Sequence, residues 1–367
     1  MTRTGLSRST VNQRIDALLQ GALIVPSGEQ APTRGRPAEK FGFNRGRGVL
    51  LVADLGATGM RVALCDLAGE ILSERDVVVD VAEGPVVVLE RIQQEFVGLL
   101  AAAKLKRSAV LGIGLDVPGP VDSASGRVVS PPIMNGWDGF DIPGWFGSRY
   151  GCPVLVEKDV NAMAWGEQHL AHPHVADLLM LKVGTGVGGG LVSGGHIFRG
   201  ADGAAGDIGH LHVDLPAAGP EPECRCGNTG CVEAYAGGWA LLRDLADGGA
   251  DVRTVDDVVT LIRSGDLAAV RLARRAGRAL GEGIAHAVNL FNPRVIVVGG
   301  QLAHVEEQLF AGIREMVYRR SLPLATRNLQ IVRSHLDRRA GLIGLALLLA
   351  DTIFAPDQVD AMVSVTG

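Results

Sequence analysis

The sequence predicts a two-lobed α/β body preceded by a small basic head. Short apolar strands precede long helical segments along most of the chain, and an opening of strand, glycine-rich turn and strand occurs twice. This order is typical of α/β folds with a mostly parallel sheet, and its repetition indicates two related halves. The 367 residues, 47% hydrophobic and 20% charged, suffice for two or three domains with large cores. We expect a head at 1–46 and lobes at 47–172 and 173–367.

The charge of the chain is unevenly distributed. The formal net charge is −5. Residues 1–46 hold seven basic and three acidic side chains, a net of +4, so the rest of the chain carries −9. This distribution argues against nucleic-acid binding over the whole surface and favours it in the head alone.

Composition also bears on location. The first residues are polar, unlike a signal peptide, and the longest apolar run, 342–350, is too short to span a bilayer. Three of the five cysteines lie within eight residues, which does not resemble a secreted disulfide framework. We expect a soluble cytoplasmic protein that does not bind a membrane.

The head begins with a predicted helix. Ser7 can cap it, Gln20 ends it, and Gly21 can close it in a left-handed conformation. Residues 4–6 before it resemble the tight turn of a helix-turn-helix. One face is an apolar stripe of Val11, Ile15, Leu18 and Leu19. The opposite face offers side chains that donate to phosphates and base edges, namely Arg8, Ser9, Asn12 and Gln13.

A two-stranded wing is expected after this helix. Residues 23–25 and 40–43 bracket a loop rich in Pro, Gly, Ser and Thr, in which Arg34 and Arg36 flank a glycine. Such a loop tip fits a narrow minor groove. The alternative is an ordinary amphipathic helix with a solvated polar face, but turn, helix and basic wing together favour DNA binding. A winged helix needs other helices to cover its apolar stripe, so either the true start lies upstream or the stripe has another cover.

The body shows strand and helix patterns from residue 49 onward. We expect strands at 49–55, 60–67, 70–79, 109–115, 154–157, 178–183, 191–198 and 295–298, and helices at 86–104, 160–171, 268–290 and 340–354.

Two glycine-containing turns are candidate phosphate sites. In the first, Gly56 lets the backbone approach phosphate, Thr58 can donate a hydrogen bond, and Asp54 can hold a magnesium-bound water, although short Asp/Gly turns are also ordinary hairpin chemistry. Residues 184–189 match the dinucleotide fingerprint, but a strand follows rather than a helix, so we reject a Rossmann site. A second phosphate-binding hairpin fits better, made by Gly184, Thr185 and Gly186, with Gly299 and Gly300 as a further nucleotide-side turn.

A cluster of cysteines predicts a metal site. Cys224, Cys226 and Cys231, with His210 upstream, supply three thiolates and one imidazole, a complete tetrahedral shell for Zn²⁺. The cysteines could instead be free or oxidised, but a cytosolic context favours zinc. Because four protein ligands close the shell, the predicted zinc is structural.

Asp159 lies where a predicted strand meets a predicted helix. A carboxylate there can act as a general base for a hydroxyl. From local sequence alone, a plain N-cap for the following helix is favoured.

From residue 49 to about 354 the chain resembles the ROK family of repressors, open reading frames and sugar kinases. This resemblance implies an actin-like, ribonuclease H-like pair of α/β lobes, and the head resembles a partial winged helix-turn-helix of the repressor branch. The most specific match is the pattern Cys-x-Cys-Gly-x-x-Gly-Cys-x-Glu at 224–233; the others are 54–58, 117–122, 135–137, Asp159 with Asn161, 184–190 and 206–210.

The resemblance also implies residue roles. It assigns zinc to His210, Cys224, Cys226 and Cys231, and sugar hydroxyl contacts to Asn135, Asp159, His210 and Glu233. In the family's kinases, the aspartate matching Asp159 deprotonates the sugar hydroxyl that attacks the γ-phosphate of ATP.

The chain departs from the kinase pattern at four positions. Ala57 adds a methyl group where the kinases have a second glycine, and Gly59 replaces Lys or Asn. Lys158 replaces Asn; it can donate to a sugar oxygen, but its charge would weaken Asp159 as a base. Asp207 replaces Glu and reaches less far toward a sugar. These changes favour sensing over phosphoryl transfer.

The sequence therefore predicts a transcriptional regulator of carbohydrate metabolism, acting as a repressor. The head would bind operator DNA in a homodimer or dimer of dimers, and a sugar or sugar phosphate would bind between the lobes. The alternative is an ATP-dependent hexose kinase with a vestigial head, which alone would require ATP and Mg²⁺. A sugar-binding module without either activity is a third possibility.

Overall fold

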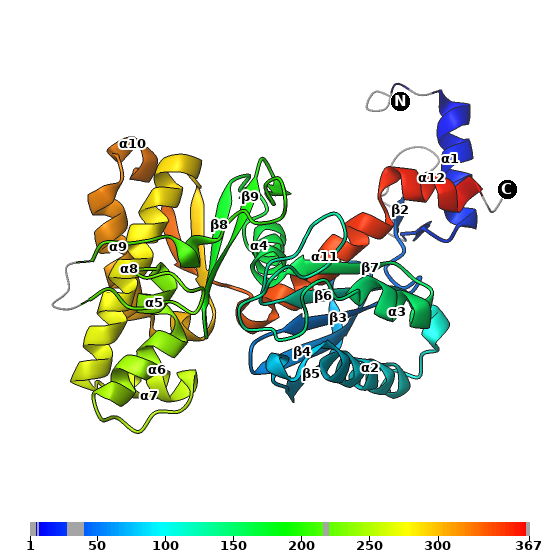
Figure 1. Ribbon diagram of the computed structural model, residues 1–367. Helices are drawn as coiled ribbons and strands as arrows, with labels where there is room; N and C mark the ends of the chain where they lie inside the picture. Colours follow the sequence, from blue (N-terminus) through cyan, green and yellow to red (C-terminus); the bar gives the residue numbers. More distant parts are fainter. Residues whose placement is uncertain (1–4, 6, 28–39, 216–219, 365–367) are drawn as a thin grey trace.

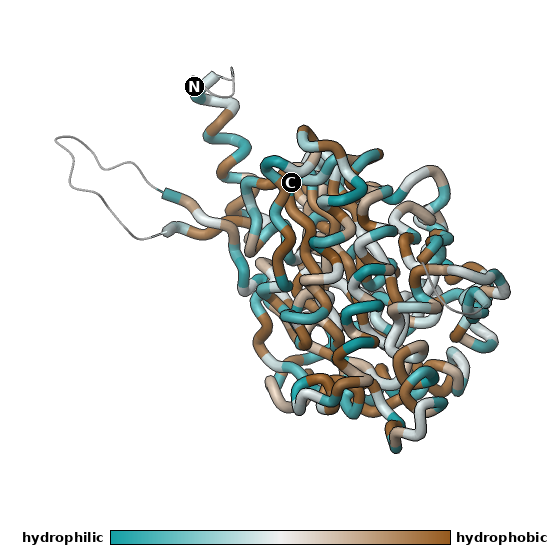
Figure 2. Tube along the Cα trace, turned by 90° about the vertical axis from the view of Figure 1, so that its left-hand side faces the viewer, coloured by the Kyte–Doolittle hydropathy of each residue, from teal (hydrophilic) through white to brown (hydrophobic). Residues whose placement is uncertain are grey.

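The computed structural model describes Gly5 and residues 7–27, 40–215 and 220–364. The chain forms two α/β lobes and a small head beside the first lobe (Figure 1). Apolar segments concentrate inside the body, and the head projects from it (Figure 2). No single helix among the described residues is long and apolar enough to cross a membrane; Asp337–Ile353 and Pro356–Val363 pass that test only together, bent by 56°.

The first lobe is built on a five-stranded sheet in the order β5-β4-β3-β6-β7. Its strands are β3 (Val49–Leu55), β4 (Gly59–Cys65), β5 (Ile71–Val78), β6 (Val110–Val117) and β7 (Val154–Lys158). Helices α2 (Pro85–Ala102) and α3 (Ile142–Tyr150) cover one face, where α2 buries Val88, Ile92, Phe96 and Leu99 at the spacing of one helix face.

The second lobe repeats this plan in the order β10-β9-β8-β11-β12. Its strands are β8 (Leu178–Val183), β9 (Val187–Ser193), β10 (His196–Ile197), β11 (Val295–Gly299) and β12 (Gln330–Arg333). Helices α8 (Leu267–Phe291) and α9 (Glu306–Arg320) pack on it, together with α5 (Val232–Ala236), α6 (Gly238–Asp247), α7 (Val255–Arg263) and α10 (Pro323–Thr326). The repeated strand order confirms the expectation of two related halves.

Three local predictions are wrong. Each sheet has two parallel and two antiparallel pairs rather than being mostly parallel. The strand expected from residue 191 begins earlier, because residues 187–190 already belong to β9. Glycines at 189 and 190 let other backbone segments pack directly against that strand. Asp159 is the first residue of α4 (Asp159–Leu170), whose N-cap position is Lys158, so it is no plain N-cap.

Helices α4 and α11 (Ala340–Ile353) lie between the two sheets. They cross at glycines: a Cβ on Gly344 would lie 1.7 Å from the Ala162 carbonyl oxygen, and one on Gly166 would lie 2.6 Å from that of Ala340. Helix α11 packs on the first sheet through Leu342, Leu345 and Leu349, so the C-terminal chain returns to the first lobe. The division of the chain at residues 46 and 172 stays a prediction.

The head consists of α1 (Arg8–Gln20) and a two-stranded sheet of β1 (Ile24–Pro26) and β2 (Phe41–Phe43). Ser7 caps α1 by accepting from the Thr10 amide, as expected. Gly21 is not left-handed; Ala22 is, with φ 53°. Helix α12 (Pro356–Ser364) contacts α1 (Figure 1), and the apolar stripe of α1 is half-buried. Arg34, Arg36 and the turn residues Thr4 and Leu6 lie outside the described residues.

Candidate functional site

A cleft of about 860 Å³ lies between the two lobes. The ends of β3 and β7 border it on one side, and the turn between β8 and β9 borders it on the other. Helices α4 and α11 contribute Val160, Met163 and Gly341. The cleft is therefore formed where the two related halves meet.

Strand register places three carboxyl groups side by side near the ends of β3, β6 and β7, and Asp54 of these lines the cleft. In the first sheet Asp54 pairs with Asp116, and Asp116 pairs with Glu157 on the next strand. Asp116 is fully buried, and burial together with Asp54 and Asp159 raises its pKa well above the usual range for a carboxyl group. One Asp116 oxygen accepts from the Leu55 amide, and the other has no partner.

Asp159 lies at the end of β7, pointing into the same region. Its Oδ1 accepts from the Val160 amide at 2.7 Å, and its Oδ2 accepts from the Lys182 ammonium at 2.6 Å. Lys182 belongs to β8 of the opposite lobe, so the ion pair joins the two lobes. Sequence reasoning missed Lys182, although a lysine in the apolar strand Leu178–Val183 is an available signal.

A buried network fixes the β7–α4 junction from behind. The carboxylate of Glu157 accepts from the Asn161 side-chain amide at 2.9 Å and from two nitrogens of Arg199 at 2.9 and 2.6 Å. Because Glu157 is nearly inaccessible, the Arg199 charge compensates it directly. This network holds the backbone that carries Lys158 and Asp159.

The predicted phosphate turns reach the cleft from both lobes. The cleft is lined from the first lobe by Asp54, Gly56 and Thr58, and from the second lobe by Gly184, Thr185, Gly186 and Gly300. Gly300 has φ 89°, and a Cβ there would meet the Val183 backbone at 2.5 Å, so glycine is required. Gly299 is buried behind the cleft, where a Cβ would meet the end of Met180.

The predicted metal ligands lie together beside the cleft. The Cys224 sulfur is 3.6 Å from His210 Nδ1, and the Cys226 and Cys231 sulfurs are 3.7 Å apart. A tetrahedral zinc shell requires ligand separations of about 3.6 to 3.8 Å. All four donor atoms lie within 4.8 Å of one another, and none of these cysteines is in a disulfide. The residues therefore fit zinc.

Most predicted sugar-binding residues line the cleft. Lys158, Asp207, His210 and Glu233 do so, whereas Asn135 is exposed outside it. Glu233 is fixed by the Val187 amide at 2.8 Å and the Trp239 indole at 3.1 Å. Glu233 follows Cys231 by two residues, so the metal loop positions a side chain of the cleft.

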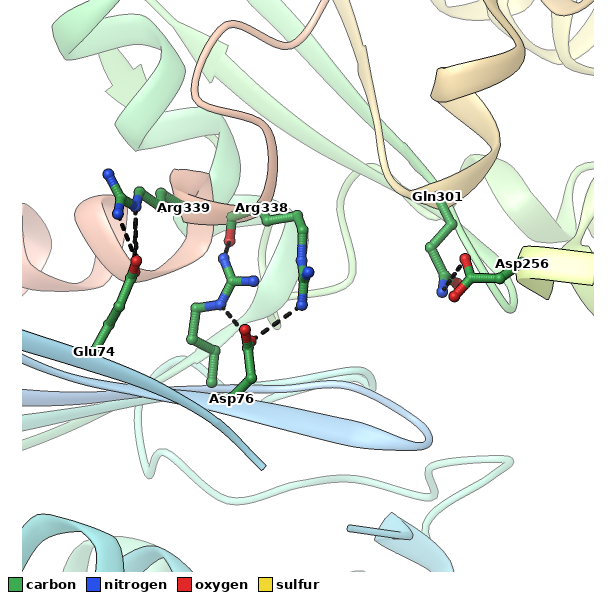
Figure 3. Close-up of polar contacts among 7 residues, drawn as sticks. Glu74, Asp76, Asp256, Gln301, Arg338 and Arg339 are labelled. Carbon is green, nitrogen blue, oxygen red and sulfur yellow. Dashed lines mark hydrogen bonds and ion pairs between the residues drawn. The ribbon is translucent and has the colours of Figure 1, made fainter. Parts of the chain in front are cut away.

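The outer end of the cleft is polar and was not predicted. On the first lobe, Asp76 accepts from Arg61 at 2.8 Å and from Arg338 at 3.1 Å (Figure 3). Opposite them, the Gln301 amide contacts Asp256 at 3.4 Å. The Arg338 contact ties the segment before α11 to strand β5. Sequence patterns could not predict it, because these residues are distant along the chain.

Comparisons with known proteins agree with this architecture. The model of the ROK family matches residues 51–352. A xylose repressor of Caldicellulosiruptor bescii is 27% identical over 96% of this chain and 91% of its own length. A glucokinase of Thermotoga maritima is 30% identical over 83% of this chain and 98% of its own. The crystal structure of a ROK family transcriptional regulator, homologous to the Escherichia coli MLC protein, superposes with a TM-score of 0.81 at 27% identity, covering 98% of this chain and 91% of the other.

Proposed function

The chain belongs to the ROK family, in its transcriptional-regulator branch, and on this basis we propose that it is a sugar-responsive repressor of carbohydrate metabolism. Coverage supports this choice. The xylose repressor and the structurally similar regulator match nearly the whole chain, including the head, whereas the glucokinase matches 83% of it. The family model itself begins at residue 51, after the head.

The observation that carries the proposal is a continuous connection from the cleft to the head. Helix α11 begins at the cleft, where a Cβ on Gly341 would lie 3.0 Å from carboxylate atoms of both Asp54 and Asp116. At its other end the Phe354 ring packs edge-on against Phe43 of the head, with ring centroids 5.1 Å apart. A ligand that changes the angle between the lobes would thereby move the surface on which the head rests.

A second contact supports the same route. Helix α12 continues from α11 and contacts α1, and Arg14 of α1 pairs with Asp360 of α12 at 3.0 Å. Ligand binding shifts a regulator only if the ligand prefers one arrangement of its parts. We propose that a sugar or sugar phosphate in the cleft selects one lobe arrangement and hence one spacing of the two heads in a cytoplasmic dimer.

DNA contact is assigned to the exposed face of α1 and to the wing. Arg8, Ser9, Asn12 and Gln13 are all exposed on this helix. Phosphate contacts from such a face give an affinity that falls steeply with salt. Arg34 and Arg36 are proposed to follow the minor groove.

Zinc is proposed as a structural ion. His210, Cys224, Cys226 and Cys231 would hold it in a closed shell, where it supplies folding free energy and no open coordination position. Since His210 and Cys226 also border the cleft, the ion would keep the sugar side of the cleft in shape.

The test is operator binding with and without sugars. Genomic fragments retained by the protein would be identified, and their affinity measured over a panel that begins with xylose, the sugar named for one relative. We expect one sugar to change the affinity at least about tenfold, and Phe354→Ala to keep sugar binding but lose that change. An affinity indifferent to every sugar that binds would refute the proposal.

A hexose kinase is the second candidate, favoured by the glucokinase similarity and by the retained Asp54, Thr58 and Asp159. ATP and Mg²⁺ would then be required, and Asp159 would be the base. Coupled ATP turnover over a hexose panel, abolished by Asp159→Asn, would establish it.

A further inference from the structure

Lys182 is the one charged residue of β8, and its ammonium group points into the cleft. Its side chain is 25% exposed and that of Asp159 is 9% exposed. Their 2.6 Å contact is therefore largely shielded from water, unlike a surface ion pair. A charge placed this deeply has a cost of desolvation that only nearby opposite charges offset.

Nearby carboxyl groups compensate the charge of the Lys182 ammonium. Burial by itself lowers the pKa of Lys182, but Asp159, Asp54 and Asp116 together raise it above the ordinary value for a lysine. The ammonium thus stays protonated in any physiological medium. Asp54 and Asp159, which line the cleft, carry the charge that a divalent cation would need.

Each oxygen of Asp159 already has one hydrogen-bond donor. Oδ1 accepts from Val160, and Oδ2 accepts from Lys182. A general base needs an oxygen within reach of the hydroxyl proton, and a magnesium ion needs oxygen ligands or the waters they hold. The ion pair opposes both roles, because Lys182 neutralises the Asp159 carboxylate and its positive charge repels a divalent cation beside it.

We propose that the Lys182 ammonium is a built-in cation, which takes the place of a divalent cation beside Asp54 and Asp159 and makes the cleft a sugar-binding site without phosphoryl transfer. The inference rests on the proposed regulator function and deepens it. The ion pair also explains how Asp159 of the first lobe stays joined to β8 of the second lobe. Lys182 is a positioning residue, because it acts by holding Asp159.

The direct test replaces the cation. Lys182→Met keeps most of the length of the side chain and leaves Asp54 and Asp159 without a cation, so divalent ions should now bind. We expect 10 mM Mg²⁺ to raise the thermal midpoint of this variant by about 5 °C, and that of the unmodified protein by less than about 1 °C. Manganese titration followed by electron paramagnetic resonance should show one additional Mn²⁺ site in the variant.

Two control variants isolate the charge. Lys106→Met removes an exposed lysine of the first lobe, and Lys182→Arg keeps a cation at the site. Both should behave like the unmodified protein toward Mg²⁺ and Mn²⁺. A gain of metal binding in Lys106→Met, or the same gain in Lys182→Arg as in Lys182→Met, would overturn the inference.

The unmodified protein supplies a test that does not depend on folding of a variant. A Mn²⁺ site in it that Asp159→Asn abolishes, or ATP turnover with any hexose, would overturn the inference; absence of both supports it. Operator binding measured on the same sample separates the two proposals. Loss of sugar-dependent operator binding would refute the regulator function, whereas a Mn²⁺ site beside intact operator control would refute only the role of Lys182.

Discussion

The crossing of α4 and α11 provides a sharp test of how the lobes are joined. In Gly344→Ala the new Cβ would lie 1.7 Å from the Ala162 carbonyl oxygen, and contacts under 3.0 Å are essentially never seen, so the helices must separate by at least 1.3 Å. Both partners are backbone, so no side chain can rotate away. Overpacking of this kind costs about 3 kcal/mol, and the better helix propensity of alanine returns about 1 kcal/mol.

The net loss of about 2 kcal/mol corresponds to a fall in thermal midpoint of about 3 °C for a chain of this size. Differential scanning calorimetry would measure it. Gly147→Ala is the matched control, because its Cβ would have no atom within 4 Å and the same gain in helix propensity should leave it equal to or more stable than the parent. A Gly344→Ala protein as stable as the Gly147→Ala control would refute the argument that this crossing requires glycine.

Three further predictions concern metal, charge and pH. Cys226→Ser should lose one equivalent of zinc by elemental analysis and unfold at a lower temperature, since a structural metal contributes folding free energy; full zinc content would contradict the assignment. Arg199→Met should lower the free energy of unfolding by about 3 kcal/mol in urea, because it strands the buried Glu157 carboxylate, whereas Arg253→Met, from an exposed ion pair, should have no effect. The raised pKa of Asp116 means that the folded chain keeps a proton that the unfolded chain loses above about pH 4. The contribution of Asp116 to the free energy of unfolding is therefore most favourable at low pH and falls as the pH rises. Asp116→Asn should therefore flatten the decline in stability as the pH rises above about 4, and an unchanged pH profile would refute the argument.

Local patterns predicted much of the body. The strands 49–55 and 178–183 have the predicted bounds, α8 is one residue longer than predicted at each end, and α11 begins as predicted and ends one residue earlier. These segments are long or wholly apolar, so their periodicity is clear. The metal ligands were also predicted, because chelation requires particular residue types at short spacing, and the structure brings all four within 4.8 Å.

The tertiary structure decided what the cleft can do. The amino-acid sequence by itself determined the elements, the metal cluster and the family, since these depend on local spacing and motif. It did not reveal that Lys182 of one lobe reaches Asp159 of the other, or that α12 contacts α1, because both contacts join segments that are distant along the chain. Such contacts depend on strand register and helix crossing, which are fixed only when the whole core is packed.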